Sequence, residues 1–219
     1  MRPATTTAQA RDTPTRRSGE ETREHVLAIA QQLFHFEGIR ATGIDTVAER
    51  AGVAPPTLYR LFTSKDGLVS AYVERCSHHY RTVLSAATAP CAGGPREQIL
   101  AVFAAFDDEV RSGARRGCPF LMVLAEYPDP RHPAHIKAIA HKAWLRGLFH
   151  QLARQLAEVE PVRDHQVLAE QLALVAEGVY GSLQALGPGG PAAHGRACAQ
   201  ALIDAARGNA VPTNAPEGH

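Results

Sequence analysis

The sequence has little of what a disulfide framework or a metal site would need. Its 219 residues include four widely scattered cysteines with no Cys-x-x-Cys pair: Cys76, Cys91, Cys118 and Cys198. Histidine is more frequent, but His132, His135 and His141 are separated by three and six residues, a spacing that does not define one helical face. We therefore expect no disulfides, no bound metal and no other cofactor.

Long hydrophobic runs are also missing. The longest stretch without an acidic residue, lysine or arginine, 178–195, is broken by several glycines and two prolines, so it does not resemble a membrane-spanning helix. The first 20 residues are polar and lack the apolar core of a signal peptide. These absences predict a cytoplasmic protein with no membrane partner.

Neither sign of charge dominates the chain. The formal net charge is +1, and residues 21–80 contain six basic and seven acidic side chains. Residues 1–20 hold four arginines against Asp12 and Glu20. Binding to a polyanion such as DNA would therefore depend on the placement of a few groups rather than on bulk charge.

The most informative segment is 41–62, which has the pattern of two short helices joined by a tight turn. Four apolar residues recur at helical spacing in its first half: Ile44, Val47, Ala48 and Ala51. Gly52 follows directly, where the chain must reverse and a left-handed backbone angle costs glycine little. Pro55 and Pro56 suit the first turn of the second helix, whose amides have no intrahelical partner.

One side of that second helix is predicted to face solvent. Leu58 and either Leu61 or Phe62 point back toward the first helix, which leaves an outer set available to a duplex: Pro55, Pro56, Thr57, Tyr59 and Arg60. Such a pair of helices can place its second member in the major groove of DNA. The alternative is an ordinary helical hairpin inside a core.

The flanking segments predict two further helices. Ser18 and Glu21 have the spacing of a capping box, and the helix they begin ends at Gly38. Downstream, Ser64 and Lys65 begin another helix, expected to run to His79, whose free amides, positive dipole end and lysine charge favour a phosphate.

A specific combination of residues joins these segments: Val26-Leu27, Ala30, Leu33-Phe34, Gly38-Ile39, Ala41-Thr42, Val47-Ala48, Ala51-Gly52-Val53, Thr57-Leu58-Tyr59, Phe62 and Ser64-Lys65. This combination, over about residues 22–72, resembles the N-terminal domain of the TetR family of transcriptional regulators. The resemblance implies an all-α protein with a three-helix DNA-binding head and a larger helical body that binds a small-molecule effector and forms a homodimer. It further implies sequence-specific binding to a double-stranded DNA operator, usually as a repressor relieved by the effector.

The resemblance also implies roles for individual residues. Thr42, Tyr59 and Lys65 match positions that contact the DNA backbone, and Pro55, Pro56, Thr57 and Arg60 match the base-facing part of the recognition helix. Two positions depart from the family pattern. Ala54 replaces a frequent capping serine, at a cost of about 1 kcal/mol, and Gly43 replaces a frequent serine or threonine, which removes one phosphate contact.

Composition and helical periodicity divide the chain into four parts. We expect a disordered arm at 1–20, the DNA-binding domain at 21–80, the ligand-binding and dimerisation domain at 81–208 and a disordered tail at 209–219. Residues 81–94 are rich in alanine, proline and glycine and are interpreted as a hinge. The arm is interpreted as a solvated tail, with insertion into the minor groove as the alternative. Within the body, helices are expected over about 95–111, 117–126, 132–159, 163–186 and 191–207.

Two stripes in the last helices are predicted to form the dimer interface, partly because the resemblance implies a dimer: Leu168, Leu172, Val175 and Val179, then Ala197, Ala201, Leu202 and Ala205. Small residues let helices approach closely, and two such helices from each subunit would form a four-helix bundle. Packing within one subunit is the alternative.

A ligand pocket needs apolar walls with a few polar groups. The candidate lining residues are Phe103, Phe106, Phe120, Met122, Glu126, His141, Trp144, Leu145, Phe149 and Tyr180. Glu126 and His141 are the most informative, because they are polar residues in apolar surroundings. Plain core packing is the alternative for each apolar member.

A different class of function rests on Cys118. A small helical enzyme could use it as a nucleophile with a histidine base, although no Cys/His/Asp order supports this and the following Pro-Phe suggests burial. Cys118 could also sense oxidants or electrophiles, whereas free cysteine is often a small buried hydrophobe. We favour the regulator and predict that the chain is not an enzyme.

Overall fold

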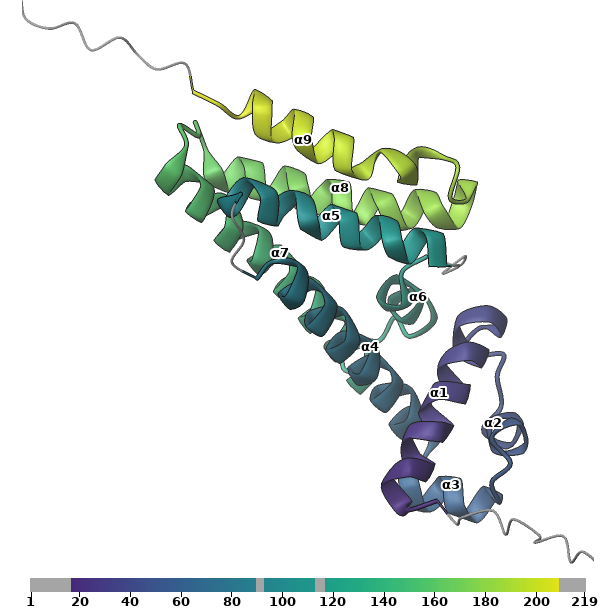
Figure 1. The fold of residues 1–219 in the computed structure, drawn as a ribbon. Helices are drawn as coiled ribbons and strands as arrows, with labels where there is room; N and C mark the ends of the chain where they lie inside the picture. The colour runs from purple at the N-terminus through teal and green to yellow at the C-terminus, as the bar shows by residue number, and fades with distance from the viewer. Residues whose placement is uncertain (1–16, 90–92, 113–116, 209–219) are drawn as a thin grey trace, which may run out of the picture.

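The computed structural model describes residues 17–89, 93–112 and 117–208, and helices make up the regular structure of these segments (Figure 1). The helices are α1 (Gly19–Glu37), α2 (Ile44–Ala51), α3 (Pro55–Phe62), α4 (Lys65–Ala87), α5 (Gly94–Ser112), α6 (Pro119–Glu126), α7 (Pro133–Val159), α8 (His165–Leu186), the short 3-10 helix η1 (Pro191–His194) and α9 (Gly195–Ala205). The predicted all-α fold is confirmed.

The head consists of α1, α2 and α3 packed on the first turns of α4 (Figure 1). The predicted capping box begins α1: the Ser18 amide donates to Glu21 Oε2 at 2.7 Å, and the Glu21 amide donates to Ser18 Oγ at 3.2 Å. Phe34 of α1 and Tyr72 of α4 are both fully buried and meet edge to face, with ring centroids 5.4 Å apart. The core of the head therefore includes the helix that leads into the body.

That helix, α4, is longer than predicted. The sequence placed its end near His79 and a hinge at 81–94, but the helix continues to Ala87. Residues 81–87 contain neither glycine nor proline, and Leu84 is buried in the core, so nothing interrupts the helix there. The expected boundary between head and body at residue 80 thus falls inside one continuous helix.

In the body, α4 contacts α5, α6 and α7, whereas α8 packs on α7, and α9 packs on α5 and α8. The core of the body is aromatic near α5 and α7, where Phe103 and Phe149 stack with centroids 5.6 Å apart. Gly195, at the start of α9, permits a close approach to α8, because a Cβ there would lie 2.4 Å from Val179 Cγ2.

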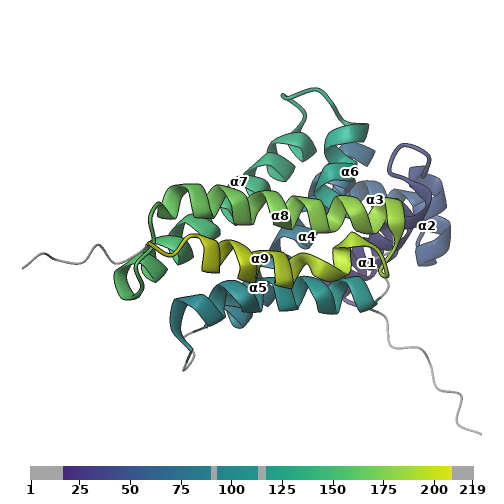
Figure 2. The same ribbon diagram turned by 90° about the horizontal axis from the view of Figure 1, so that it is seen from above.

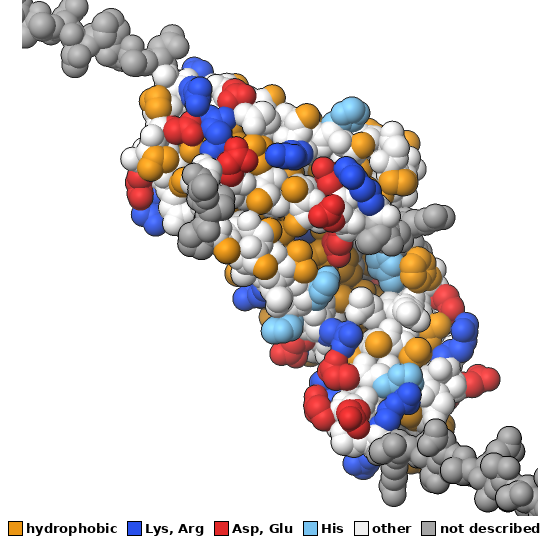
Figure 3. All heavy atoms as spheres, viewed as in Figure 1, with side chains coloured by type: hydrophobic (Ala, Val, Ile, Leu, Met, Phe, Trp, Pro, Cys, Tyr) orange, Lys and Arg blue, Asp and Glu red, His pale blue; other side chains and the backbone are white. Residues whose placement is uncertain are grey.

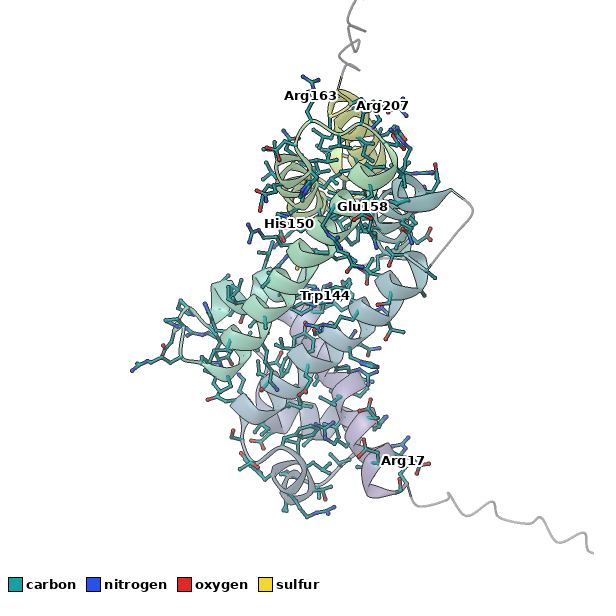
Figure 4. All side chains as sticks on the ribbon, turned by 90° about the vertical axis from the view of Figure 1, so that its left-hand side faces the viewer. Arg17, Trp144, His150, Glu158, Arg163 and Arg207 are labelled. Atoms are coloured by element: carbon teal, nitrogen blue, oxygen red, sulfur yellow. The ribbon has the colours of Figure 1, made fainter. Side chains whose placement is uncertain are left out.

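A charged cluster fastens α9 to the far end of the body, where Figure 4 labels Arg163 and Arg207. Arg96 of α5 donates two hydrogen bonds to Glu160, at 3.0 and 2.7 Å, and a third to Asp204 of α9 at 2.7 Å. These bonds, chiefly those from Arg96, lower the pKa of the Glu160 carboxyl to about 2. The position of α9 is thus set by ion pairs as well as by apolar packing.

The α8 stripe predicted for the dimer interface lies inside the subunit instead. Leu168, Leu172 and Val179 are buried in the core, and Val175 is half-buried against it. The α9 residues are placed differently, since Ala197, Ala201 and Ala205 are exposed and Leu202 is half-buried. The sequence pattern identified an apolar stripe on α8, but helix periodicity alone could not distinguish the side that packs within the subunit from the opposite side.

The opposite side of α8 is open. Figure 2 shows α8 and α9 side by side on the outside of the body. We call their exposed residues the α8–α9 face: Val167, Leu174, Gly178 and Gly181 of α8, with Ala197, Ala201 and Ala205 of α9. Leu174 is 72% exposed, and a Cβ on Gly178 or Gly181 would meet nothing within 4 Å.

Most of the two predicted terminal segments, at 1–16 and 209–219, lies outside the described residues. Gly19 and Glu20, placed in the arm by the sequence, belong to α1. In the segments that the structure describes, no helix has both the length and the apolar character needed to cross a bilayer.

Candidate DNA-binding surface and body pocket

The turn between α2 and α3 has the geometry that the sequence predicted. Gly52 adopts φ 64° and ψ 34°, a left-handed conformation that favours glycine. The Gly52 amide donates to Glu49 O and the Val53 amide to Ala48 O, both at 3.0 Å, so the last carbonyls of α2 are satisfied as the chain reverses. His25 Nε2 of α1 lies 3.0 Å from Ala51 O and holds the same helix end from the other side.

The turn leaves one side of α3 buried and the other in solvent. Leu58 and Phe62 are buried, whereas four of the five predicted outer residues are exposed: Pro55, Pro56, Tyr59 and Arg60. Thr57 is half-buried. Within the described segments Arg60 has no hydrogen-bond or ion-pair partner, so its guanidinium is available to a nucleic acid.

The start of α4 fixes α3 by close backbone contact. A Cβ on Gly67 would lie 2.0 Å from Phe62 O, so only glycine lets the end of α3 approach this turn. Ser64 caps α4, and its Oγ accepts from the Gly67 amide at 3.1 Å. The recognition helix is therefore braced at both ends.

Two of the predicted backbone-contacting residues form hydrogen bonds within the head. Thr42 is 2% exposed, and its hydroxyl donates to Gly38 O at 2.7 Å, so its side chain is not on the surface that a duplex would touch. Lys65 is half-buried, and its Nζ donates to Arg40 O at 3.1 Å, which ties α4 to the loop between α1 and α2. The sequence could not show these two bonds because each requires the folded loop.

Ala54 provides no side-chain cap for α3, as predicted, but the structure reduces the cost of its absence. Pro55 and Pro56 have no amide hydrogen, and the Thr57 amide already donates to Ala54 O at 2.9 Å. The first turn of α3 therefore lacks the unsatisfied donors that a capping side chain usually serves.

Apart from Glu126, the predicted pocket residues fall into three groups. Around a nearly closed space of about 10 Å³ lie five of them: Phe106, Phe120, His141, Leu145 and Tyr180. The same space is also lined by Tyr80, Leu84, Cys118 and Lys142, which the sequence analysis did not place in the pocket. Phe103, Met122 and Phe149 are buried in the core away from that space. Trp144 is half-buried on α7 and faces α4, with the Arg81 guanidinium 4.9 Å from its ring (Figure 4).

His141 is a packed, neutral core residue. Its ring stacks on Phe120 with centroids 3.7 Å apart, and Nδ1 lies 3.1 Å from Ser77 Oγ. Burial, followed by the nearby charges of Lys142 and Arg81, lowers the pKa of His141 to about 3. The imidazole is therefore uncharged at neutral pH.

Glu126 does not line the pocket. It ends α6 and reaches into the head, where Oε1 accepts from the Ile39 amide at 3.0 Å and Oε2 from the Arg40 amide at 2.6 Å. Beside it, the Arg40 guanidinium lies 5.7 Å from the centre of the Tyr127 ring. Helix α6 thus lines the closed core at one end and binds the α1–α2 loop at the other. Glu126 is 87 and 86 residues away in sequence from Ile39 and Arg40, so no local pattern could predict these two hydrogen bonds.

Cys118 is poorly placed for nucleophilic catalysis. It is 3% exposed, and burial raises the pKa of its thiol, so the reactive thiolate is disfavoured. Among the described residues no group of three histidine, cysteine or acidic side chains is arranged to hold a metal ion.

Comparison with known proteins agrees with this geometry. Residues 26–72 match the family model described as "Bacterial regulatory proteins, tetR family". The HTH-type transcriptional regulator YjdC of Escherichia coli is 30% identical over 159 residues, which cover 71% of this chain and 80% of that protein. The HTH-type transcriptional repressor NemR of the same species is 29% identical over 110 residues, half of this chain and 55% of NemR.

The fold is also shared along nearly its whole length. SCO4454, a TetR-family transcriptional regulator from Streptomyces coelicolor, superimposes with a TM-score of 0.80 at 29% identity, covering 86% of this chain and 97% of that one. With a helix-turn-helix head, a structural match over 86% of its length and a similar regulator over most of the sequence, this chain belongs to the TetR family of DNA-binding transcriptional regulators.

Proposed function

We propose that this protein is a homodimeric repressor that reads an operator with α3 and leaves it when a small molecule binds. The observation that carries the proposal is the exposed, braced outer side of α3, where Arg60 has no partner in the described segments. A guanidinium in this position can donate two hydrogen bonds to the O6 and N7 atoms of guanine. Pro55, Pro56, Thr57 and Tyr59 would complete the contact surface.

The placement of charges in the head indicates that two heads must bind together. The head has no excess of basic residues, so α3 depends on Arg60, on the dipole at the start of α4 and on Lys65 nearby. Arg17, which Figure 4 places at the head end of the molecule, leads into the predicted arginine-bearing arm. We therefore expect modest affinity from one head and useful affinity only when two heads bind together.

The dimer would form through the α8–α9 face. It has exposed apolar and small side chains on two adjacent helices, which suits close helix packing with a second copy. In such a dimer the two α3 helices would be about one DNA turn apart, roughly 34 Å, and the operator would be an inverted repeat.

Ligand binding in the body would change the position of the head through α4 and α6, because both helices join the body to the head. A ligand that favours one body conformation shifts the population of head positions without contacting DNA. Glu126 gives α6 a direct hold on the α1–α2 loop, and α4 carries the head itself. Repression is the favoured direction because the similar NemR is named a repressor.

A gel-shift titration with DNA that flanks the protein's own gene tests the proposal. Operator affinity should fall steeply as salt rises, because phosphate contacts release counterions. Arg60→Ala should weaken binding by about 1–3 kcal/mol, and the loss should depend on the base at one operator position.

Arg154→Ala is the matched control, since it removes one exposed arginine from α7, where Arg154 pairs only with Glu158 among the described residues. A salt-independent affinity, or equal losses from the two variants, would contradict α3 as the recognition helix. A reporter gene behind the operator then tests direction, because loss of the protein should raise expression.

A further inference from the structure

A second cavity, separate from the closed core space, lies where the head meets the body. Its volume is about 260 Å³, and it is lined by residues of α1, α4, α5 and α6. Figure 3 shows the surface hollowed between the head and α5, with hydrophobic and histidine side chains around the hollow. An open, more polar groove between α1 and α4 adjoins this cavity, and Gln31 and His79 line both.

Aromatic rings and polar side chains form most of the walls. Tyr72 and Tyr80 of α4 contribute rings, and Gln31 and His79 contribute hydrogen-bonding groups. Tyr80 also lines the closed core space and contacts Phe120 edge to face, with centroids 5.7 Å apart. A molecule in the cavity would therefore touch the head on one side and, through Tyr80, the body core on the other.

The Tyr72 hydroxyl is the most unusual group in these walls. Tyr72 is fully buried, and no nitrogen or oxygen atom of the described residues is placed to bond its hydroxyl. The Cys76 thiol is a polar neighbour of this hydroxyl but a weak hydrogen-bond partner, and burial strongly raises the pKa of Tyr72. A buried hydroxyl without a strong partner is costly, so a ligand that supplies one gains affinity there.

Charge and size narrow the class of ligand. Glu109 is acidic and accepts a hydrogen bond from the Tyr180 hydroxyl at 3.0 Å, while no lysine or arginine is found among the described lining residues. His79 Nε2 lies 3.9 Å from Glu109 Oε1 and is already paired with that carboxylate, so a second anion would meet like charge with no lysine or arginine in the described lining to balance it. A cavity of about 150 Å³ accommodates benzene, so 260 Å³ suits a molecule of about two fused rings.

We propose that this junction cavity is an effector site that takes a compact, uncharged aromatic alcohol of the naphthol type, with its hydroxyl bonded to Tyr72. The inference rests on the proposed ligand-controlled function and gives it a location and a ligand class. Because the cavity is bounded by α1 of the head and by α4, α5 and α6, a bound ring acts as a wedge that favours one head position.

Fluorescence titration of the full-length protein with 2-naphthol tests the site directly and needs no DNA. Saturable binding is expected, and 2-naphthoate, its anionic counterpart, should bind at least tenfold more weakly. Tyr72→Phe should weaken 2-naphthol binding about threefold to tenfold, the value of one hydrogen bond. It should not lower the melting temperature, because the hydroxyl has no strong partner in the free protein. Cys76→Phe, which fills the cavity, should abolish binding.

Tyr127→Phe is the matched control, since Tyr127 is a half-buried tyrosine at the head–body contact that does not line the cavity. Equal affinity of wild type and Tyr72→Phe, equal binding of 2-naphthoate, or no saturable binding would each overturn the proposal. Operator affinity measured without 2-naphthol decides the regulator function separately. A protein that binds its operator but shows no Tyr72-dependent binding refutes the cavity alone.

Discussion

His141 shows how one buried side chain couples stability to pH. Phe120 covers one side of the ring, Tyr80 and Trp144 lie beside it, and Ser77 is its hydrogen-bond partner. The charged groups that lower its pKa, after burial itself, are Lys142 and Arg81. In the unfolded chain the same imidazole has a pKa near 6.5.

The sign of the effect follows from proton binding. Below about pH 6.5 the unfolded state takes up a proton that the folded state refuses until about pH 3, so the folded state loses stability as pH falls through this window. From pH 6.5 to pH 5 the loss from this residue should be about 2 kcal/mol. Urea unfolding at several pH values measures it, and His141→Phe should flatten the curve in that window.

His78→Phe is the matched control, because it makes the same substitution at a histidine of α4 that is exposed to solvent rather than buried. It should leave the slope unchanged. An equal slope for wild type and His141→Phe would mean that the buried imidazole is not the group that resists protonation.

At the scale of the element, a capping serine is expected to affect stability at the start of α4 but hardly at all at the start of α3. Ser64 Oγ accepts from the Gly67 amide at the start of α4, so Ser64→Ala should lower the free energy of unfolding by about 1 kcal/mol.

Ala54→Ser supplies the side chain that many relatives are expected to have at the start of α3. It should change stability by less than about 0.5 kcal/mol, because Pro55 and Pro56 have no amide hydrogen to bond. Thermal unfolding of both variants would show whether a proline-led helix gains from a cap.

The link between α6 and the head gives a second prediction at this scale. Glu126→Gln leaves one oxygen acceptor and turns an amide group toward backbone donors, so it should weaken the hold on Ile39 and Arg40. Hydrogen exchange of those two amides should accelerate about fivefold to thirtyfold. Asp129→Asn, in the exposed α6–α7 turn beside Arg131, makes the same chemical change and should leave both amides unaffected. Unchanged exchange in Glu126→Gln would remove α6 as a route to the head.

These elements also show what the sequence could and could not predict. The capping box at Ser18, the left-handed turn at Gly52 and the outward side of α3 depend on residues close in sequence, and local patterns predicted all three. Thr42, Glu126 and the predicted α8 stripe took other positions, because their neighbours are decided by tertiary packing. The junction cavity was missed for the same reason, since its walls come from four separate helices.

For the whole molecule, the proposed homodimer depends on which surface could pair two copies. The buried stripe of Leu168, Leu172 and Val179 cannot meet a partner without unpacking the subunit, whereas the α8–α9 face is already exposed. Leu174 lies on the side of α8 opposite that stripe and is 72% exposed. Exposed apolar residues of this kind on adjacent helices are typical of an interface between subunits.

Leu174→Glu should therefore convert the proposed dimer to a monomer, because it would place two like charges inside the proposed four-helix interface. Light scattering coupled to size-exclusion chromatography measures the mass of each species. Ile136→Glu is the control, since Ile136 is also an exposed apolar residue, 53% exposed, but lies on α7. A monomeric Leu174→Glu protein should retain its helical content. It should lose most of its operator affinity, because one head alone is expected to make few phosphate contacts, whereas two linked heads bind one duplex at high effective concentration. If Leu174→Glu stays dimeric, the interface lies elsewhere. If it is monomeric and still binds its operator with the wild-type affinity, a single head is sufficient.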